Sequence, residues 1–155
     1  MAEKIWGSPT QWETKRYGYI RKTVDFSSST WNTVATHELY TVTGVVRIKL
    51  IAYCTESLTD TGGTATIQLG VEGTTNNMIA ATTITTIDIN ELWYDNTPAA
   101  INTPANVIFE RVINGLDIGY QIVNEALLDG TLVFELWWEG LSDGATISAG
   151  AGGAL

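Results

Sequence analysis

The chain has 155 residues, the size of one domain, and its formal net charge of -9 comes from 17 acidic and 8 basic residues. Binding to the phosphate backbone of nucleic acids needs an excess of Lys and Arg, so this charge argues against a nucleic-acid partner. A single cysteine excludes an intramolecular disulfide, and no stretch reaches the ~18 apolar residues of a membrane helix, so we expect a soluble protein made in the cytoplasm, with no membrane partner.

The basic residues are concentrated near the N-terminus. Residues 1–24 hold five of the eight basic residues but only two acids. Residues 1–16 show no hydrophobic periodicity and predict an extended basic arm beside an acidic body. Tryptophans are costly to leave in water, so we expect this arm to dock on a partner, although a solvated arm that binds nothing specific is the alternative. The arm residues expected to contact a partner are Trp6, Trp12, Lys15 and Arg16.

Alternation of apolar and polar residues predicts β-strands in the first half of the chain. Residues 17–26 alternate, and the Thr- and Val-rich segment 30–42 is one strand or two joined by a kink. Two longer alternating runs follow, at 45–54 and 65–71, with a Gly-, Ser- and Thr-rich segment at 56–63 between them. They predict a central β-hairpin with an ordered loop. The residues of the first run that should share its buried face are Val46, Ile48, Leu50, Ala52 and Cys54.

The middle of the chain predicts one more strand and a crossover. Residues 78–89 form a β-branched run in which Ile84 and Ile87 are the expected core contacts. Residues 90–106 contain two of the three prolines, and proline does not donate to a strand ladder, so we expect a surface loop. Its only large groups are Trp93 and Tyr94.

Two dipeptides in the second half are typical of tight turns, because both of their residues accept a positive φ. Asn114-Gly115 lies between the alternating runs 107–113 and 116–124 and predicts a hairpin. Asp129-Gly130 is the second such signal and precedes the alternating run 131–139.

Adjacent tryptophans indicate an exposed aromatic surface. Trp137 and Trp138 must point to opposite faces of one strand, so at least one of them faces away from the core. Together with Trp93 and Tyr94 they could form a platform on which a sugar stacks. We favour a protein interface, to which Trp93, Tyr94 and Trp137 would contribute.

The strand pattern predicts an all-β fold, an antiparallel β-sandwich of jelly-roll type, with a closed barrel as the alternative. The predicted organisation is an N-terminal arm at 1–16, a sandwich domain at 17–141 and a flexible tail at 142–155. The tail is rich in Gly and Ala, which bury too little surface to order it alone, so it should be disordered or held by a neighbour.

The chain offers few groups for catalysis or metal binding. His37 is the only histidine and Cys54 the only cysteine, which excludes His-rich and cysteine-cluster zinc sites. We expect His37 to be an ordinary strand residue rather than a general base, and Cys54 to be a buried, unreactive thiol. The oxygen-rich segment 56–60 lacks the spacing of a calcium loop. We therefore expect no enzyme activity, no metal and no other cofactor.

Several strand and turn segments of residues 17–145 form a recognisable set. They include Val45-Val46-Arg47, Cys54-Thr55-Glu56, Ala65 to Val71, Ile79-Ala80-Ala81-Thr82-Thr83, Asn114-Gly115-Leu116-Asp117-Ile118, Asp129-Gly130-Thr131 and Leu141-Ser142-Asp143. Together these segments resemble a family of small all-β proteins encoded among the structural genes of tailed bacteriophages. The resemblance implies a virion component, foremost a capsid decoration or cement protein that binds the major capsid protein on the outer face of the head, commonly as a trimer. A tail, neck or fibre protein and a carbohydrate-binding module are the alternatives.

Overall fold

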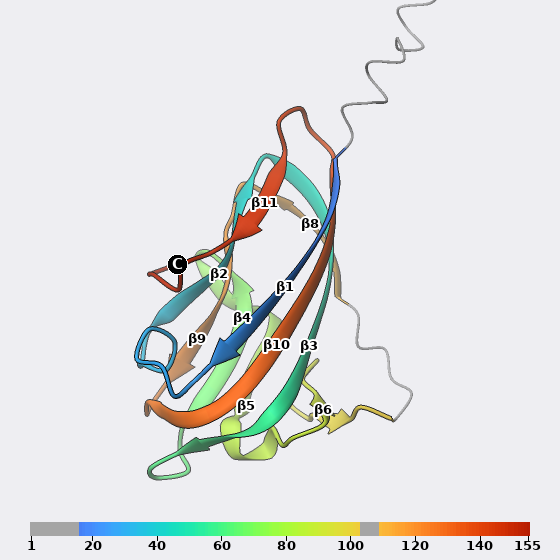
Figure 1. Ribbon diagram of the computed structural model, residues 1–155. Coiled ribbons are helices and arrows are strands. Elements are labelled where there is room, and N and C mark those ends of the chain that lie inside the picture. Colours follow the sequence, from blue (N-terminus) through green and yellow to red (C-terminus); the bar gives the residue numbers. More distant parts are fainter. Residues whose placement is uncertain (1–15, 103–108) are drawn as a thin grey trace, which may run out of the picture.

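The computed structural model describes residues 16–102 and 109–155, which form two antiparallel β-sheets packed face to face (Figure 1). The predicted all-β antiparallel sandwich is therefore confirmed. Of the predicted N-terminal arm, only Arg16 lies within the described residues.

The sheets differ in the number and length of their strands. Sheet A has the order β1-β10-β3-β6-β7, with β8 also paired to β3: β1 Tyr17–Asp25, β3 Val45–Asp60, β6 Glu91–Leu92, β7 Ala99–Ala100, β8 Phe109–Asn114 and β10 Leu127–Gly140. Sheet B has the order β11-β2-β9-β4-β5: β2 Thr36–Thr43, β4 Thr66–Val71, β5 Thr74–Thr83, β9 Ile118–Val123 and β11 Thr146–Ala149.

The core lies between the inner faces of the two sheets. The prediction for β3 is confirmed, both as a strand and in the choice of its inward face. All five alternate residues expected on that face, from Val46 to Cys54, are buried. They pack into one apolar cluster with residues of sheet B such as Ile67 and Leu69. Burial of each large aliphatic side chain contributes about 1.5–3 kcal/mol of transfer free energy, so this face holds the sheets together.

The predicted central hairpin is wrong. β3 pairs with β10, β8 and β6 in sheet A, whereas β4 pairs with β5 and β9 in sheet B. Each strand has one apolar face, and these faces bury each other when the strands lie in opposite sheets. The connection is also shorter than predicted because β3 continues to Asp60, whose carboxylate accepts hydrogen bonds from the N–H groups of Gly63 and Ala65.

Neither turn dipeptide forms the predicted hairpin. The chain does reverse at Asn114-Gly115, where Gly115 has a φ of 62°, but β8 before it belongs to sheet A and β9 after it to sheet B. Gly130 lies inside β10, at a shift in the pairing register, with a φ of 113°. A Cβ at this position would lie 2.7 Å from the Cα of Leu58, so the glycine lets a bulge in β10 approach β3.

The prediction of a flexible C-terminal tail is also wrong. β11 pairs with β2, and Ala145, Ile147 and Gly150 are buried. Beyond β11 the backbone continues to bond to β2: Gly150 N–H donates to Leu39 O, and Glu38 N–H donates to Gly153 O. Composition misleads here because residues without large side chains can lie close against a neighbouring strand, where backbone hydrogen bonds order them.

Two segments have different boundaries from those predicted. Of the run 30–42, only Thr36 onward is strand, as part of β2. β5 begins at Thr74 and ends before a 3-10 turn at Ile84–Thr86, so the run 78–89 is only partly strand. Ile84 and Ile87 are fully buried, as predicted.

Stacked aromatic rings join the two sheets. The rings of Tyr120 on β9 and Phe134 on β10 are nearly parallel, with centroids 6.3 Å apart. The ring of His37 also stacks on that of Tyr120, with the two centroids 5.0 Å apart. The hydroxyls of Tyr40 and Tyr120 donate to Phe134 O and Trp31 O, and burial raises the pKa of both tyrosines.

Candidate partner-binding face

The outer face of sheet A carries two rows of aromatic and charged side chains across its first strands. The register of β1, β10 and β3 aligns Tyr17 with Glu139 and Arg47 in one row, and Tyr19 with Trp137 and Lys49 in the next. Cross-strand neighbours on one face are about 5 Å apart, so the side chains of each row lie beside one another across the sheet. We call this surface the aromatic face: Tyr17, Tyr19, Arg21, Arg47, Lys49, Glu110, Val112, Glu135, Trp137 and Glu139.

Large apolar groups are exposed on this face. Tyr17 is 69% exposed, Tyr19 50% and Trp137 39%, and Val112 on the neighbouring β8 is 64% exposed. The rings of Tyr19 and Trp137 lie 5.2 Å apart and are tilted by 40°. Such a cluster of exposed rings on adjacent strands is a feature of binding surfaces.

Ion pairs and hydrogen bonds tie the charged groups to their neighbours across the strands. The Glu139 carboxylate lies 3.4 Å from an Arg47 nitrogen and accepts a 3.4 Å hydrogen bond from the Tyr17 hydroxyl. Glu135 forms the matching set with Arg21 at 3.9 Å and the Tyr53 hydroxyl at 3.0 Å. Desolvation and the bond to Glu135 raise the pKa of Tyr53. Surface pairs contribute little stability, so their main effect is to hold the side chains in place.

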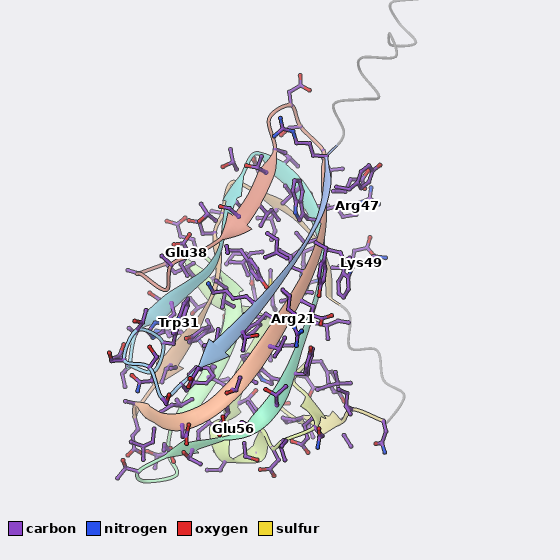
Figure 2. All side chains as sticks on the ribbon, viewed as in Figure 1. Arg21, Trp31, Glu38, Arg47, Lys49 and Glu56 are labelled. Carbon is purple, nitrogen blue, oxygen red and sulfur yellow. The ribbon has the colours of Figure 1, made fainter. Side chains whose placement is uncertain are left out.

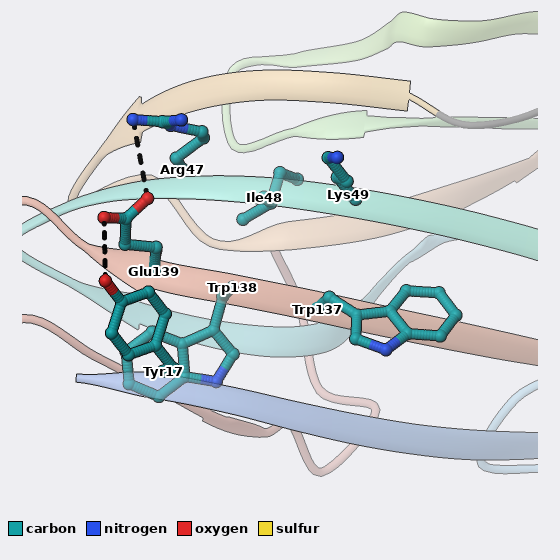
Figure 3. A pocket seen from close by; sticks show the side chains of 7 residues that line it. All are labelled: Tyr17, Arg47, Ile48, Lys49, Trp137, Trp138 and Glu139. Atoms are coloured by element: carbon teal, nitrogen blue, oxygen red, sulfur yellow. Dashed lines mark hydrogen bonds and ion pairs between the residues drawn. The ribbon is translucent and has the colours of Figure 1, made fainter.

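A shallow cavity lies within the aromatic face (Figure 3). Its volume is about 230 Å³, and its lining includes Tyr17, Arg47, Lys49 and both tryptophans of β10. Trp138 points toward the core side of the sheet and is half-buried, whereas Trp137 lies on the outer side. The prediction that one of the two tryptophans faces away from the core is therefore confirmed.

Trp93 is not a surface residue, and its expected exposure is wrong. Its side chain is fully buried, its ring meets that of Phe134 edge to face, and its indole N–H donates to the Thr82 hydroxyl at 2.9 Å. The loop assignment failed because Trp93 N–H bonds to Ala52 O, which draws the segment against β3. Tyr94 is half-buried and lies just after β6 in the sequence. In sheet A, β6 and β1 lie on opposite sides of β3.

The other predicted contact residues are placed as follows. Arg16 is exposed next to the aromatic face, and its carbonyl accepts a hydrogen bond from Gly140 N–H. Trp6, Trp12 and Lys15 lie outside the described residues. The structure thus places Arg16 next to the end of β10 at Gly140, Tyr94 elsewhere on the surface and Trp93 inside.

Sequence reasoning missed Tyr17, Tyr19, Arg47 and Lys49 as members of this face. The parity of each strand was available, because Arg47 and Lys49 fall opposite the buried residues of β3. The missing information was that β1 and β3 both pair with β10. The strands β1 and β10 are far apart in the sequence, with 122 positions between Tyr17 and Glu139.

The described residues contain no cluster of three or more His, Cys, Asp or Glu side chains placed to hold a metal ion. Within the same residues, no helix has the length and apolar character needed to cross a membrane.

No family model and no curated protein matches this chain. Two solved structures are similar to it. A chain of the acidic stable capsid structure of Helicobacter pylori bacteriophage KHP30 is 10% identical, with a TM-score of 0.48, and the match covers 86% of this chain and 98% of that one. A chain of the cyanophage Pam1 capsid asymmetric unit is 14% identical, with a TM-score of 0.45 and coverage of 82% and 86%. These structural neighbours are phage capsid proteins.

Proposed function

We propose that this chain is a structural protein of a phage virion, and that it acts as a capsid decoration protein bound to the outer surface of the head. The observation that carries the proposal is the aromatic face. Trp, Tyr and Arg dominate the energetics of protein interfaces, and here they lie together on three adjacent strands of a rigid sandwich. A surface of this composition fits a chain that bridges other subunits.

The sequence resemblance of residues 17–145 supplies the kind of partner, the major capsid protein, and a trimer as the assembly state. The strand order supports the jelly-roll assignment, because β1-β10-β3-β8 in one sheet faces β2-β9-β4-β5 in the other. Decoration of a lattice needs many repeated contacts of modest strength. The avidity of these contacts together exceeds the affinity of any single one.

Two parts of the chain would make the contacts. Trp137 would bury its exposed ring against another subunit of the particle, with Arg16 and Tyr94 as secondary contacts. The arm, through Trp6, Trp12 and Lys15, would reach across a subunit boundary. An acidic body beside a basic arm favours this, because the arm is attracted to the acidic surface of a neighbouring copy.

Binding to undecorated capsids tests the proposal. We expect Trp137→Ala to lower the occupancy at least tenfold at limiting protein, which corresponds to about 1.4 kcal/mol, and deletion of residues 2–14 to lower it further. Val34→Ala is the matched control, because Val34 is 53% exposed and lies outside the aromatic face. Unchanged occupancy in Trp137→Ala and in the deletion variant would contradict these contacts. Absence of capsid binding by the unaltered chain would contradict decoration, and cryo-electron microscopy of the particle would then distinguish a tail, neck or fibre position.

A carbohydrate-binding function is the second candidate, favoured by the Tyr19 and Trp137 rings beside an open cavity. Sugars stack on such rings through their apolar faces. Titration of saccharides while recording tryptophan fluorescence tests it, with Trp137→Ala as the control. A fluorescence change in the unaltered chain that is lost in Trp137→Ala would support this function. Absence of binding to any saccharide on a glycan array would count against it.

A further inference from the structure

We infer that the aromatic face is a contact between two copies of this chain, packed face to face around a two-fold axis that runs along β10 past Trp137. The inference goes beyond decoration because such a contact forms between free copies without a capsid. It leaves the remaining surfaces for a trimer, so that on a particle it would join neighbouring trimers.

Charge is the first argument for a second copy as the occupant. The aromatic face carries three carboxylates and three cations, Arg21, Arg47 and Lys49, which are labelled in Figure 2. The other described residues include three basic and twelve acidic side chains. Two copies therefore repel each other over most of their surface. The aromatic face is where two copies can approach without an excess of like charge.

The pattern of side chains on the face is the second argument. A two-fold axis along β10 places β1 of one copy over β3 of the other and keeps the rows in register. Tyr17 then faces Arg47 of the second copy, and Tyr19 faces Lys49 of the second copy. Each of these is a cation over an aromatic ring, a contact that is attractive by about 0.5–2 kcal/mol depending on its exposure.

The centre of the face is compatible with this packing. Trp137 lies between Tyr19 and Lys49 in the second row, so the two-fold axis places it near the same residue of the second copy. Glu135 and Glu139 also lie on β10 and approach their equivalents. Each carboxylate is already paired within its own chain, Glu135 with Arg21 and Tyr53, and Glu139 with Arg47 and Tyr17. Sheets packed face to face lie about 10 Å apart, which leaves room for one layer of interdigitated side chains.

The expected affinity is low. The face has ten residues, fewer than the roughly 20–30 per partner of a standard stable interface, which places the pair among weak complexes with a Kd on the order of 100 μM. The cross-strand bonds reduce the entropy lost on association, because the side chains are held before contact. On a capsid, the high local concentration of copies would favour the pair.

Sedimentation velocity of the purified chain from about 10 μM to 1 mM tests the association, a range that spans the expected Kd. We expect the weight-average mass to rise with concentration in the unaltered chain and in Val34→Ala, and the midpoint to move at least tenfold higher in Trp137→Ala. A chain that stays monomeric throughout overturns the inference.

Chemical cross-linking tests the geometry. Sheets packed face to face lie about 10 Å apart, too far for a direct disulfide, so a short bis-maleimide is used to join the thiols. Tyr19→Cys and Lys49→Cys are introduced into separate chains, because the packing places Tyr19 of one copy opposite Lys49 of the other. We expect an equimolar mixture of the two variants to form cross-linked dimers, and each variant alone to form far fewer. The native Cys54 is buried and remains in all variants as an internal control. Cross-linking of each variant alone that equals that of the mixture overturns the two-fold arrangement.

Capsid binding separates this inference from the proposed function. A chain that stays monomeric but decorates capsids in a Trp137-dependent manner keeps the function and overturns the pair. A chain that forms the pair but binds no capsid keeps the pair and overturns the function. A monomeric chain whose tryptophan fluorescence responds to a saccharide, with a response that is lost in Trp137→Ala, identifies a carbohydrate as the occupant and overturns the pair.

Discussion

The indole of Trp138 occupies the space that a side chain on Gly18 would need. The two residues are paired across β1 and β10, and a Cβ on Gly18 would lie 2.2 Å from the indole nitrogen. The glycine therefore allows the beginning of β1, with Tyr17 and Tyr19, to lie against β10. The shape of the aromatic face depends on this one small residue.

We expect Gly18→Ala to lower the free energy of unfolding by about 1–3 kcal/mol, since the indole or β1 must move to make room. Chemical denaturation followed by tryptophan fluorescence measures the change. Gly153→Ala is the control, because a Cβ at Gly153 meets no atom within 4 Å, and it should be close to neutral. Equal stability of the two variants would show that Trp138 adapts without cost.

The C-terminal segment should contribute measurably to stability. Gly152 has a φ of 83°, and its missing Cβ would lie 2.8 Å from the Trp31 ring, so Gly152→Ala combines backbone strain of roughly 1–2 kcal/mol with a clash. Removal of residues 150–155 should have a larger effect, because it also removes Gly150 O, which accepts a hydrogen bond from the Lys22 ammonium. Burial lowers the pKa of Lys22, and the nearby Glu38 carboxylate opposes this shift.

Hydrogen exchange at the Glu38 amide reports on this segment directly, because that N–H donates to Gly153 O. We expect faster exchange in Gly152→Ala and in the truncated chain. Ala151→Ser, at an exposed position, should leave the exchange rate unchanged. Full protection of the Glu38 amide in the truncated chain would contradict the ordered tail.

The buried hydrogen bond between Trp93 and Thr82 should be worth more than a surface bond. Thr82→Val leaves the indole N–H without this acceptor in the core, which costs about 1–3 kcal/mol, whereas Trp93→Phe removes the donor and part of the packing. Unfolding of both single variants and of the double variant gives the coupling energy. We expect the double variant to lose less stability than the sum of the single variants, and strict additivity would contradict the bond.

Stability should fall at high pH in part through Cys54. Burial raises the pKa of this thiol to about 11, from an ordinary value of 9.0. Above pH 9 the unfolded chain releases the thiol proton while the folded chain keeps it, so stability is full below pH 9 and is lost up to about pH 11, by at most about 1.4 kcal/mol per pH unit.

Urea unfolding at pH 7, 9 and 10.5 checks the sign and the source of this loss. Cys54→Ala should be less stable at pH 7 because it leaves a small cavity, but its stability should decline less between pH 9 and 10.5. A thiol reagent such as DTNB should react with the unaltered chain only after unfolding. An identical pH dependence in both chains would assign the loss to other groups, such as the buried tyrosines.

The alternation of residues in β3 predicted its buried face correctly because strand parity is a local property. The partners of a strand are not local. Consecutive strands here mostly cross between sheets, as from β3 to β4 and from β8 to β9, so the turn signal at Asn114-Gly115 marked a reversal of the chain but not a pairing. The two-residue period of apolar side chains determines which of them face inward. It does not indicate which strand pairs with which.

Composition misled at two positions for related reasons. Trp93 lies in a segment with the polar residues and proline of a loop, yet backbone bonds to β3 draw it into the core. The Gly- and Ala-rich tail lacks large apolar side chains, yet its main chain extends the ladder of β2. In both cases long-range backbone hydrogen bonds, which no local pattern reports, decide the outcome. The exposure of Trp137 was predictable because adjacent residues of a strand must diverge.

The pairing of β1 with β10 has a consequence for synthesis of the chain. β1 leaves the ribosome early, but its partner begins at Leu127, and β2 receives its edge strand β11 later still. Until β10 and β11 have been made, the early strands have open edges able to pair with other nascent chains. Such non-local pairing slows folding, so high expression at elevated temperature should favour inclusion bodies, and slower translation should raise the soluble yield.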